Sequence, residues 1–437
     1  MPWKGVSPLL NRLIIFGRYP EPGRVKTRLI PFLGPAGAAE LQRQLTEKVF
    51  ETARVFSRDK KVQIEFCYDG GTGRKIRYWL GNGIKLTPQG TGGLGDRMAR
   101  AVFRAFNDEV SRRVLLIGTD IPGLEARHLS EAFNSLDSND LVLGPSTDGG
   151  YWLVGMRHYF NIFKEIPWST EKVISYTIAL AKEAGLKVHL LPALTDIDTA
   201  EDISLSGWDK PVPRPPYISV IIPALNEEEN ILDAIRSAQA PDTEIIVVDG
   251  GSTDRTRSMA QQAGVKVIQG PKGRAVQQNM GASIAKGRIL LFLHADTRLP
   301  VNYLSHIFET FMFPGCVAGA FQFKTDLNNF LMKLIEFGTN IRARYFRLPY
   351  GDQALFVHRS TFEHIKGFPE VPVAEDLYIM RRLSKIGRIR IAPADIITSA
   401  RRWQSSGIIR TTSVHLAVLF GCCMGISSRV LSSMLDN

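Results

Sequence analysis

Two acidic residues stand where apolar segments end, and their positions suggest chemistry. Asp120 follows an apolar run that begins at Val114, and Asp296 follows one that begins at Ile289. Burying a carboxylate costs free energy unless a cation or hydrogen-bond donors compensate. Mg²⁺ that bridges carboxylates and nucleotide phosphates is a common compensation. We therefore predict that both residues bind a metal, with a cap for a helix near residue 126 as the alternative for Asp120.

Cations cluster in a loop whose backbone is shaped by glycine and proline. Arg18, Lys26 and Arg28 lie in this loop, which covers residues 17–29. A triphosphate requires several cations at short range. We predict that these three side chains bind nucleotide phosphates, and a solvated basic loop is the alternative.

The second half of the chain carries residues suited to a nucleotide diphosphate. Lys272 and Arg274 stand at the start of a helical pattern, where backbone N–H groups also favour anions. Arg402 can pair with a diphosphate, and Trp403 can stack on a ring. Asp249 ends another apolar run and can accept a hydrogen bond from a ribose hydroxyl or a base N–H.

Adjacent acids at Glu375 and Asp376 are candidates for acid–base chemistry. Either could remove a proton from an acceptor, while the charge of its neighbour tunes its pKa. The alternative is that both simply favour the N-terminus of a helix. Two further dipeptides are predicted to contact substrates: Asp148-Gly149 and Asp352-Gln353.

Strands and helices must alternate along the chain to hold these residues. Runs rich in Val, Ile and Leu predict strands buried on both faces. The alternation predicts two α/β domains with mainly parallel sheets, in which ligands bind beyond the carboxyl ends of the strands. Four prolines within residues 209–216 predict an extended linker between domains 1–208 and 217–437. Helical patterns lie at 36–57, 93–107, 170–184, 227–239, 254–263 and 273–286.

Composition narrows the class of partner. The chain has 437 residues and a net charge of +11, which favours an anionic partner. Nucleic acid is disfavoured because the sequence has no zinc finger, RNP motif or stripe of interleaved basic and aromatic residues. The 4 cysteines form no C-x-x-C motif, so a reducing cytoplasm is the expected setting.

No apolar stretch reaches the ~20 residues of a membrane-spanning helix, and the N-terminus is not typical of a signal peptide. The longest apolar candidate is Leu416–Ile426. We expect this segment to be a buried helix. The alternative is a helix in the interface of a membrane, which would make the protein peripheral at the inner membrane face.

Motifs across residues 11–205 resemble those of bacterial nucleotidyltransferase-like proteins. The family is similar to molybdenum-cofactor and phospholactate guanylyltransferases, and one branch is transferase 1 of selenium- or arsenosugar-associated gene clusters. The resemblance implies a glycosyltransferase-A-like Rossmann variant in which Lys26 and Arg28 hold triphosphate and Asp120 holds metal. The matching motifs are Pro-Gly-x-x-Lys-Thr-Arg-Leu (22–29), Gly-x-Asp-x-Pro (118–122), Asp-Gly-Gly-Tyr (148–151) and Asp-Ile-Asp-Thr-x-Glu-Asp (196–202).

Motifs across residues 217–405 resemble those of family 2 glycosyltransferases, in a branch similar to transferase 2 of the same clusters. The matching motifs are Pro-x-x-Asn-Glu (223–227), Val-Asp-x-Gly-Ser-x-Asp (248–254), Gly-Asp-Gln (351–353), Glu-Asp (375–376) and Arg-Trp (402–403).

This second resemblance implies transfer of a sugar from a nucleotide diphosphate sugar, with inversion and with help from Mg²⁺ or Mn²⁺. It makes Asp376 the general base, Asp296 a metal ligand and Asp249 a nucleotide contact. The family's Asp-x-Asp motif reads His294-Ala-Asp296 here, so a histidine replaces one carboxylate. His294 is either a second metal ligand or a buried structural residue.

These observations predict a two-domain sugar-nucleotide enzyme. The second half would move a sugar from a nucleotide diphosphate sugar to a small-molecule or lipid acceptor. The first half would make or bind that sugar nucleotide. If it synthesises the sugar nucleotide, it would consume an NTP. The alternative is that one half is a non-catalytic, nucleotide-binding regulatory module.

Overall fold

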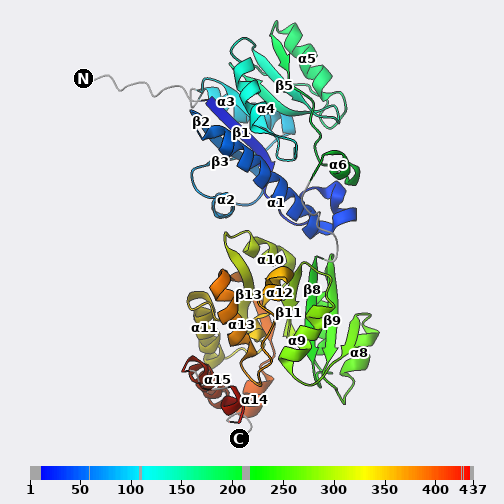
Figure 1. Ribbon diagram of the computed structural model, residues 1–437, viewed down its shortest axis with the longest axis vertical. Coiled ribbons are helices and arrows are strands. Elements are labelled where there is room, and N and C mark those ends of the chain that lie inside the picture. Colours follow the sequence, from blue (N-terminus) through cyan, green and yellow to red (C-terminus); the bar gives the residue numbers. More distant parts are fainter. Residues whose placement is uncertain are drawn as a thin grey trace, which may run out of the picture. The chain divides into compact units, whose positions relative to one another are not determined.

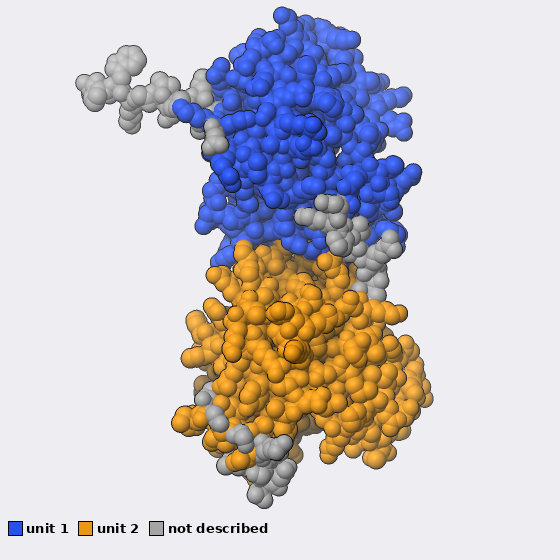
Figure 2. All heavy atoms as spheres, in the orientation of Figure 1, with its two compact units in different colours: residues 1–213 blue, residues 214–437 orange. Residues whose placement is uncertain are grey.

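A computed structural model describes residues 11–58, 60–107, 111–208, 217–424, 426 and 428–433. The chain divides into two compact units, residues 1–213 and 214–437 (Figure 2). The division falls inside the predicted linker 209–216, which lies outside the described residues.

The first unit is built on a seven-stranded sheet of order β3-β2-β1-β4-β6-β5-β7. Strand β6 is antiparallel to both of its neighbours, and the other neighbouring strands run parallel. The strands are β1 (Asn11–Arg18), β2 (Val62–Asp69), β3 (Lys85–Pro88), β4 (Val114–Ile117), β5 (Leu141–Pro145), β6 (Tyr151–Met156) and β7 (Val188–Leu190). The helices are α1 (Ile30–Ser57), α2 (Gly73–Leu80), α3 (Leu94–Asn107), α4 (Ala126–Ser135), α5 (Val173–Glu183) and α6 (Ala200–Leu205), with a 3₁₀ turn, η1 (Thr27–Leu29).

The second unit contains an eight-stranded sheet of order β10-β9-β8-β11-β14-β13-β15-β12 (Figure 1). Strands β10, β9, β8 and β11 are parallel, and β14 is antiparallel to both of its neighbours. The strands are β8 (Ile218–Ala224), β9 (Thr243–Asp249), β10 (Lys266–Gln269), β11 (Ile289–Phe292), β12 (Thr297–Arg298), β13 (Cys316–Thr325), β14 (Phe356–His358) and β15 (Arg388–Thr398).

Ten helices and a 3₁₀ turn complete the described part of the second unit. They are α7 (Ile231–Ala238), α8 (Thr256–Gln262), α9 (Arg274–Ser283), α10 (Tyr303–Phe311), α11 (Phe330–Tyr345), α12 (Arg359–His364), α13 (Glu375–Ile386), α14 (Arg401–Ser406), α15 (Ile408–Cys423), α16 (Ser428–Ser433) and η2 (Gly351–Gln353). The predicted class, α/β with mainly parallel sheets, is confirmed in both units.

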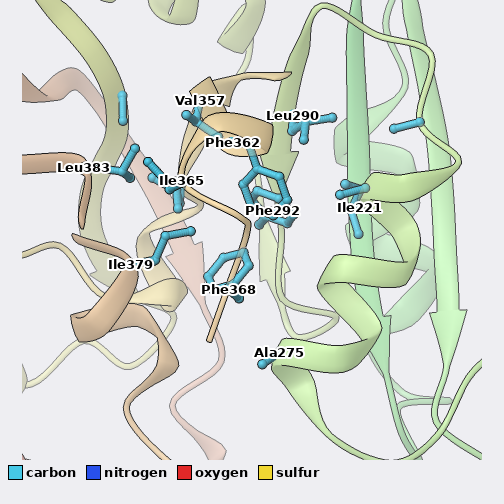
Figure 3. Close-up of a cluster of buried hydrophobic side chains, with 14 of the residues drawn as sticks. Ile221, Ala275, Leu290, Phe292, Val357, Phe362, Ile365, Phe368, Ile379 and Leu383 are labelled. Carbon is cyan, nitrogen blue, oxygen red and sulfur yellow. The ribbon is translucent and has the colours of Figure 1, made fainter. Parts of the chain in front are cut away.

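The core of the second unit positions the helices that carry the predicted site. Figure 3 shows Ala275 of α9 and Ile379 of α13 in one cluster with Phe292 of β11. The Phe292 and Phe368 rings meet edge to face, with centroids 4.8 Å apart. Burial of these apolar side chains fixes both helices against the sheet, so their N-termini have defined positions.

Candidate active site

A cavity of about 990 Å³ lies in the second unit. Its lining includes predicted site residues from five separate segments of the chain, which only the fold brings together. These residues are Lys272, Arg274, Asp296, Asp352, Glu375, Asp376, Arg402 and Trp403.

Asp376 is the strongest candidate for a general base. One of its carboxylate oxygens, Oδ2, accepts a hydrogen bond from the backbone N–H of Gly351 at 2.9 Å. Burial, followed by repulsion from the neighbouring Glu375, raises the pKa of Asp376 to about 7. A carboxyl group with that pKa is well matched to proton removal near neutral pH.

Glu375 has a different environment although it is adjacent in sequence. Its Oε1 accepts from Nη1 of Arg274 at 3.1 Å, and its side chain is buried. Burial opposes the charge of Arg274, but Glu375, Asp376 and Asp296 hold the pKa of its guanidinium above the usual value. This ion pair ties the start of α9 to the start of α13, so of the two acids Asp376 is the better placed to act as a base.

His294 and Gly351 complete the surroundings of Asp376. A Cβ atom on Gly351 would stand 2.7 Å from both Asp376 Oδ2 and His294 Nε2, so only glycine fits between them. Burial and the nearby Arg274 and Arg402 lower the pKa of His294 well below its usual value. His294 Nε2 is buried and has no hydrogen-bond partner among the described residues, so a neutral ring nitrogen faces the cavity.

Asp296 and Asp352 are the carboxylates that could hold a metal here. Burial, with the charge of Asp296 contributing, raises the pKa of Asp352 to about 6. The buried Oδ1 of Asp352 lacks a hydrogen-bond partner among the described residues. Asp296 Oδ2 lies 3.5 Å from Nη2 of Arg401. The described residues contain no group of three His, Cys, Asp or Glu side chains arranged around one metal position. Asp296 and Asp352 could hold a cation only together with ligands from outside the protein, such as phosphates and water.

The cations of the second unit that are predicted to bind phosphate line the cavity near the starts of two helices. Lys272 and Gly273 precede α9, whose first turn lines the cavity with Arg274. Arg402 and Trp403 line it from α14. A helix N-terminus with flanking cations is suited to a diphosphate.

Two predicted contacts, Asp249 and Gln353, do not line this cavity. Asp249 is buried at the end of β9, and its carboxylate accepts from the N–H of Ser252. Gln353 is fully buried; its amide donates to Phe321 O at 2.9 Å and accepts from the N–H of Tyr350 at 3.2 Å. Gln353 thus anchors η2, the turn that presents Gly351 to Asp376.

In the first unit, the ammonium group of Lys26 is hydrogen-bonded to protein atoms and does not face solvent. Its Nζ donates to Asp120 Oδ2 at 3.0 Å, Asp198 Oδ1 at 2.9 Å and Ile197 O at 2.6 Å. These contacts use all three ammonium hydrogens. Despite burial, the two carboxylates hold the pKa of Lys26 above its usual value.

Arg18 and Arg28 are the predicted phosphate ligands of the first unit that remain largely exposed. Arg18 Nε lies 3.6 Å from Asp69, and Arg28 Nη1 lies 3.5 Å from Asp198. Asp120, predicted to bind metal, shares Lys26 with Asp198. The alternative cap role does not arise, because the side chain of Glu125 accepts from the first turn of α4.

Asp148 and Gly149 form a tight turn beside these carboxylates. Asp148 Oδ1 accepts from the N–H of Gly150 at 2.9 Å. Gly149 has a positive φ of 87°, and a Cβ there would stand 2.2 Å from Glu171 O. Burial, followed by the charges of Asp120 and Asp148, raises the pKa of Asp196 to about 7. Asp196 was not among the predicted site residues, although its place in the Asp-Ile-Asp motif was a signal.

Two protein-family models match the chain. One, described as "uncharacterized protein conserved in bacteria (DUF2064)", matches residues 52–170. The other, glycosyl transferase family 2, matches residues 219–365.

Similar proteins are known from bacteria and archaea. YdaM of Bacillus subtilis (strain 168), assigned as a glycosyltransferase, is 28% identical over 221 residues, which cover 44% of this chain and 53% of YdaM. Glycosyltransferase AglE of Haloferax volcanii is 37% identical over 93 residues, which cover 18% of this chain and 31% of AglE. The chain thus spans about half or less of the length of these two relatives.

A solved structure from Desulfovibrio desulfuricans G20, assigned as a nucleotide-diphospho-sugar transferase, is 33% identical to this chain. The match covers 45% of this chain and 85% of that one, with a TM-score of 0.42. Residues 219–365 of the second unit match the family 2 glycosyltransferase model, as the motifs in 217–405 predicted. The nucleotidyltransferase-like identity of the first unit stays a prediction.

The cavity of the second unit has one wall that sequence reasoning missed. Helix α15 contributes Arg410, Thr411, Val414, His415, Val418 and Leu419 to the lining. The excess of nine basic over two acidic residues in 381–437 was the available signal for an anionic ligand in this region. No described helix of the chain is long and apolar enough to cross a membrane.

Proposed function

We propose that the second unit transfers a glycosyl group from a nucleotide diphosphate sugar to an acceptor hydroxyl. The observation that carries this proposal is the Asp376 carboxylate in the cavity, with its raised pKa and its hydrogen bond from Gly351. The family 2 domain supports the same reaction class.

In this mechanism, Asp376 accepts the proton of the acceptor hydroxyl as the acceptor oxygen attacks the anomeric carbon. The bond from that carbon to the diphosphate breaks, and the nucleoside diphosphate leaves with the bonding electron pair. Attack opposite the leaving group inverts the anomeric configuration. Arg274, Lys272 and Arg402 line the cavity and counter the charge that develops on the diphosphate.

A divalent cation, Mg²⁺ or Mn²⁺, fits Asp296 with Asp352 as a second oxygen donor. When bound, it would neutralise negative charge on the diphosphate leaving group. Arg401, which pairs with Glu227 and lies 3.5 Å from Asp296 Oδ2, holds that carboxylate in place.

The test is a nucleotide-release assay with the full chain, a panel of nucleotide sugars and Mn²⁺. Mass spectrometry of ligands retained by the purified protein would identify the base and the sugar. Release from one sugar nucleotide that is lost in Asp376→Asn supports the proposal. Equal release by wild type and Asp376→Asn would contradict it.

For the first unit, we infer nucleotide binding through Arg18 and Arg28, with or without catalysis. Both side chains are exposed beside the carboxylates of Asp69 and Asp198, whereas Lys26 is bound within the protein. The full chain should be supplied with each NTP and a sugar 1-phosphate. Pyrophosphate release would show a nucleotidyltransferase, and a nucleotide-dependent thermal shift without turnover would show a regulatory module.

We place this reaction in the cytoplasm. The thiols of Cys67 and Cys316 are free in the structure, which agrees with a reducing compartment.

A further inference from the structure

Helix α11 exposes an apolar face on the second unit. Phe330, Leu334, Phe337, Ile341 and Tyr345 are all exposed. Their spacing of three or four residues puts them on one side of the helix. The opposite side is buried through Met332, which packs in a cluster with Phe323 and Trp403. The exposed side chains are therefore not part of the core that packs this helix against the unit.

Helix α15 exposes a second apolar face, so the expectation that Leu416–Ile426 is buried was wrong. Ile409, Leu416, Phe420 and Met424 are exposed at spacings of seven, four and four residues. The other side of α15 lines the cavity, and its Val418 and Leu419 pack against the cluster that contains Leu377. Together, these four residues and the five of α11 are called the apolar face below.

The two helices are neighbours. Figure 1 shows α11 and α15 close together, and they are in contact. Both reach the same small core, because Ile335 of α11 and Ile408 of α15 pack against the cluster that contains Trp403. An exposed apolar surface formed by two adjacent helices is unusual for a protein that remains in water.

Exposed cations lie on the same two helices as the apolar face. Lys333 and Arg344 are exposed on α11, and Arg410 is exposed on α15, where it also lines the cavity. Glu336 is the acidic residue in the sequences of these two helices. Its Oε1 accepts hydrogen bonds from both the N–H and the hydroxyl of Thr325 at 2.8 Å. Exposed aromatic and aliphatic side chains flanked by cations are what an interfacial helix presents to anionic lipid.

We propose that the apolar face docks the protein on an anionic phospholipid bilayer. Phe337 and Phe420 insert between lipid head groups, and Lys333 and Arg344 pair with lipid phosphates. Docking in this way would bring the wall of the active-site cavity formed by α15 next to the bilayer. The acceptor class that fits this arrangement is a lipid-borne hydroxyl, an assignment that rests on the proposed function. Membrane binding itself does not depend on sugar transfer.

Vesicle flotation with the full chain tests the proposal. We expect binding to phosphatidylcholine vesicles that contain phosphatidylglycerol, and about tenfold weaker binding to pure phosphatidylcholine or at high salt. Phe337→Glu and Phe420→Glu should each weaken binding by about tenfold. Val301→Glu, which changes an equally apolar and 85% exposed residue outside α11 and α15, should bind as wild type does.

A second measurement guards against misfolded variants. The conservative Phe420→Trp should show a blue-shifted emission with phosphatidylglycerol vesicles and not with phosphatidylcholine. No binding by wild type, or equal binding by Phe420→Glu and Val301→Glu, would overturn the proposal. So would a wild-type dimer in solution that Phe420→Glu converts to monomer, because a second copy would then cover the face. If the wild-type protein transfers sugar but does not float with the vesicles, docking is refuted and the proposed function stands.

Discussion

The backbone N–H of Gly351 donates a 2.9 Å hydrogen bond to the Asp376 carboxylate, across a gap that has no room for a Cβ atom. Two segments 25 residues apart in sequence thus meet at the candidate base. The hydrogen bond fixes one carboxylate oxygen, while burial keeps the group readily protonated.

Asp376→Asn should reduce the rate of sugar transfer by about 10²- to 10⁴-fold, since an amide cannot accept the acceptor's proton. The measurement is kcat for nucleoside diphosphate release. Glu375→Gln is the matched control. It disturbs the ion pair with Arg274 and should change KM for the sugar nucleotide more than kcat. A larger kcat loss in Glu375→Gln than in Asp376→Asn would reverse the two assignments.

Activity should rise with pH through about 7, because Asp376 must be deprotonated to act as a base and its pKa is raised to about 7. The rising limb of kcat/KM against pH reports this group. Asp352, with a pKa raised to about 6, also deprotonates on this limb. A profile that is flat from pH 5 to 8 would argue against Asp376 as the base.

The same carboxyl group should lower stability at high pH. Its pKa in the folded chain is raised from the ordinary 3.8 to about 7. The folded state therefore binds the proton more tightly, and stability is lost as the pH rises between these values. We expect Asp376→Asn to melt about 5 °C above wild type at pH 8, with little difference near pH 4. An equal difference at both pH values would contradict this origin.

Gly351→Ala should impair both activity and folding. The added methyl group would stand 2.7 Å from Asp376 Oδ2 and His294 Nε2, so the turn or both side chains must shift. We expect a loss of about 2 kcal/mol in the free energy of unfolding, measured by denaturant titration, together with a fall in kcat. Gly338→Ala is the control: no atom lies within 4 Å of its added Cβ, and it should be neutral or slightly stabilising.

In the first unit, Lys26→Met should destabilise the fold. Removing the buried ammonium leaves Asp120 without its cation and Asp198 with only the exposed Arg28 as a partner. Because both carboxylates are partly exposed, we expect a loss of about 2 kcal/mol rather than the full cost of breaking a buried pair. The loss should appear in the thermal transition of this unit.

Arg28→Ala is the matched control for Lys26→Met. Its side chain is 68% exposed, so it should leave the melting temperature unchanged and weaken NTP binding. If Lys26→Met melts as wild type does while losing NTP binding, Lys26 holds phosphate directly, as its sequence motif predicts.

Local sequence patterns determined the elements and the chemical groups of this protein. Apolar runs such as Ile289–Leu293 marked buried strands, and helical spacing located α1, α3 and α9, because periodicity depends on near neighbours. The set of motifs across residues 217–405 indicated the family 2 glycosyltransferase domain for the same reason, and the family model matches residues 219–365.

Tertiary structure decided which partner each group meets. Lys26 is locked between Asp120 and Asp198, more than 90 residues away in sequence, and Glu375 is paired with Arg274 while its neighbour Asp376 faces the cavity. The apolar composition of helix α15 favoured a buried helix over a membrane interface, and only packing shows that one side is exposed. Burial, ion pairing and pKa depend on atoms brought together by the fold, which spacing along the chain does not encode.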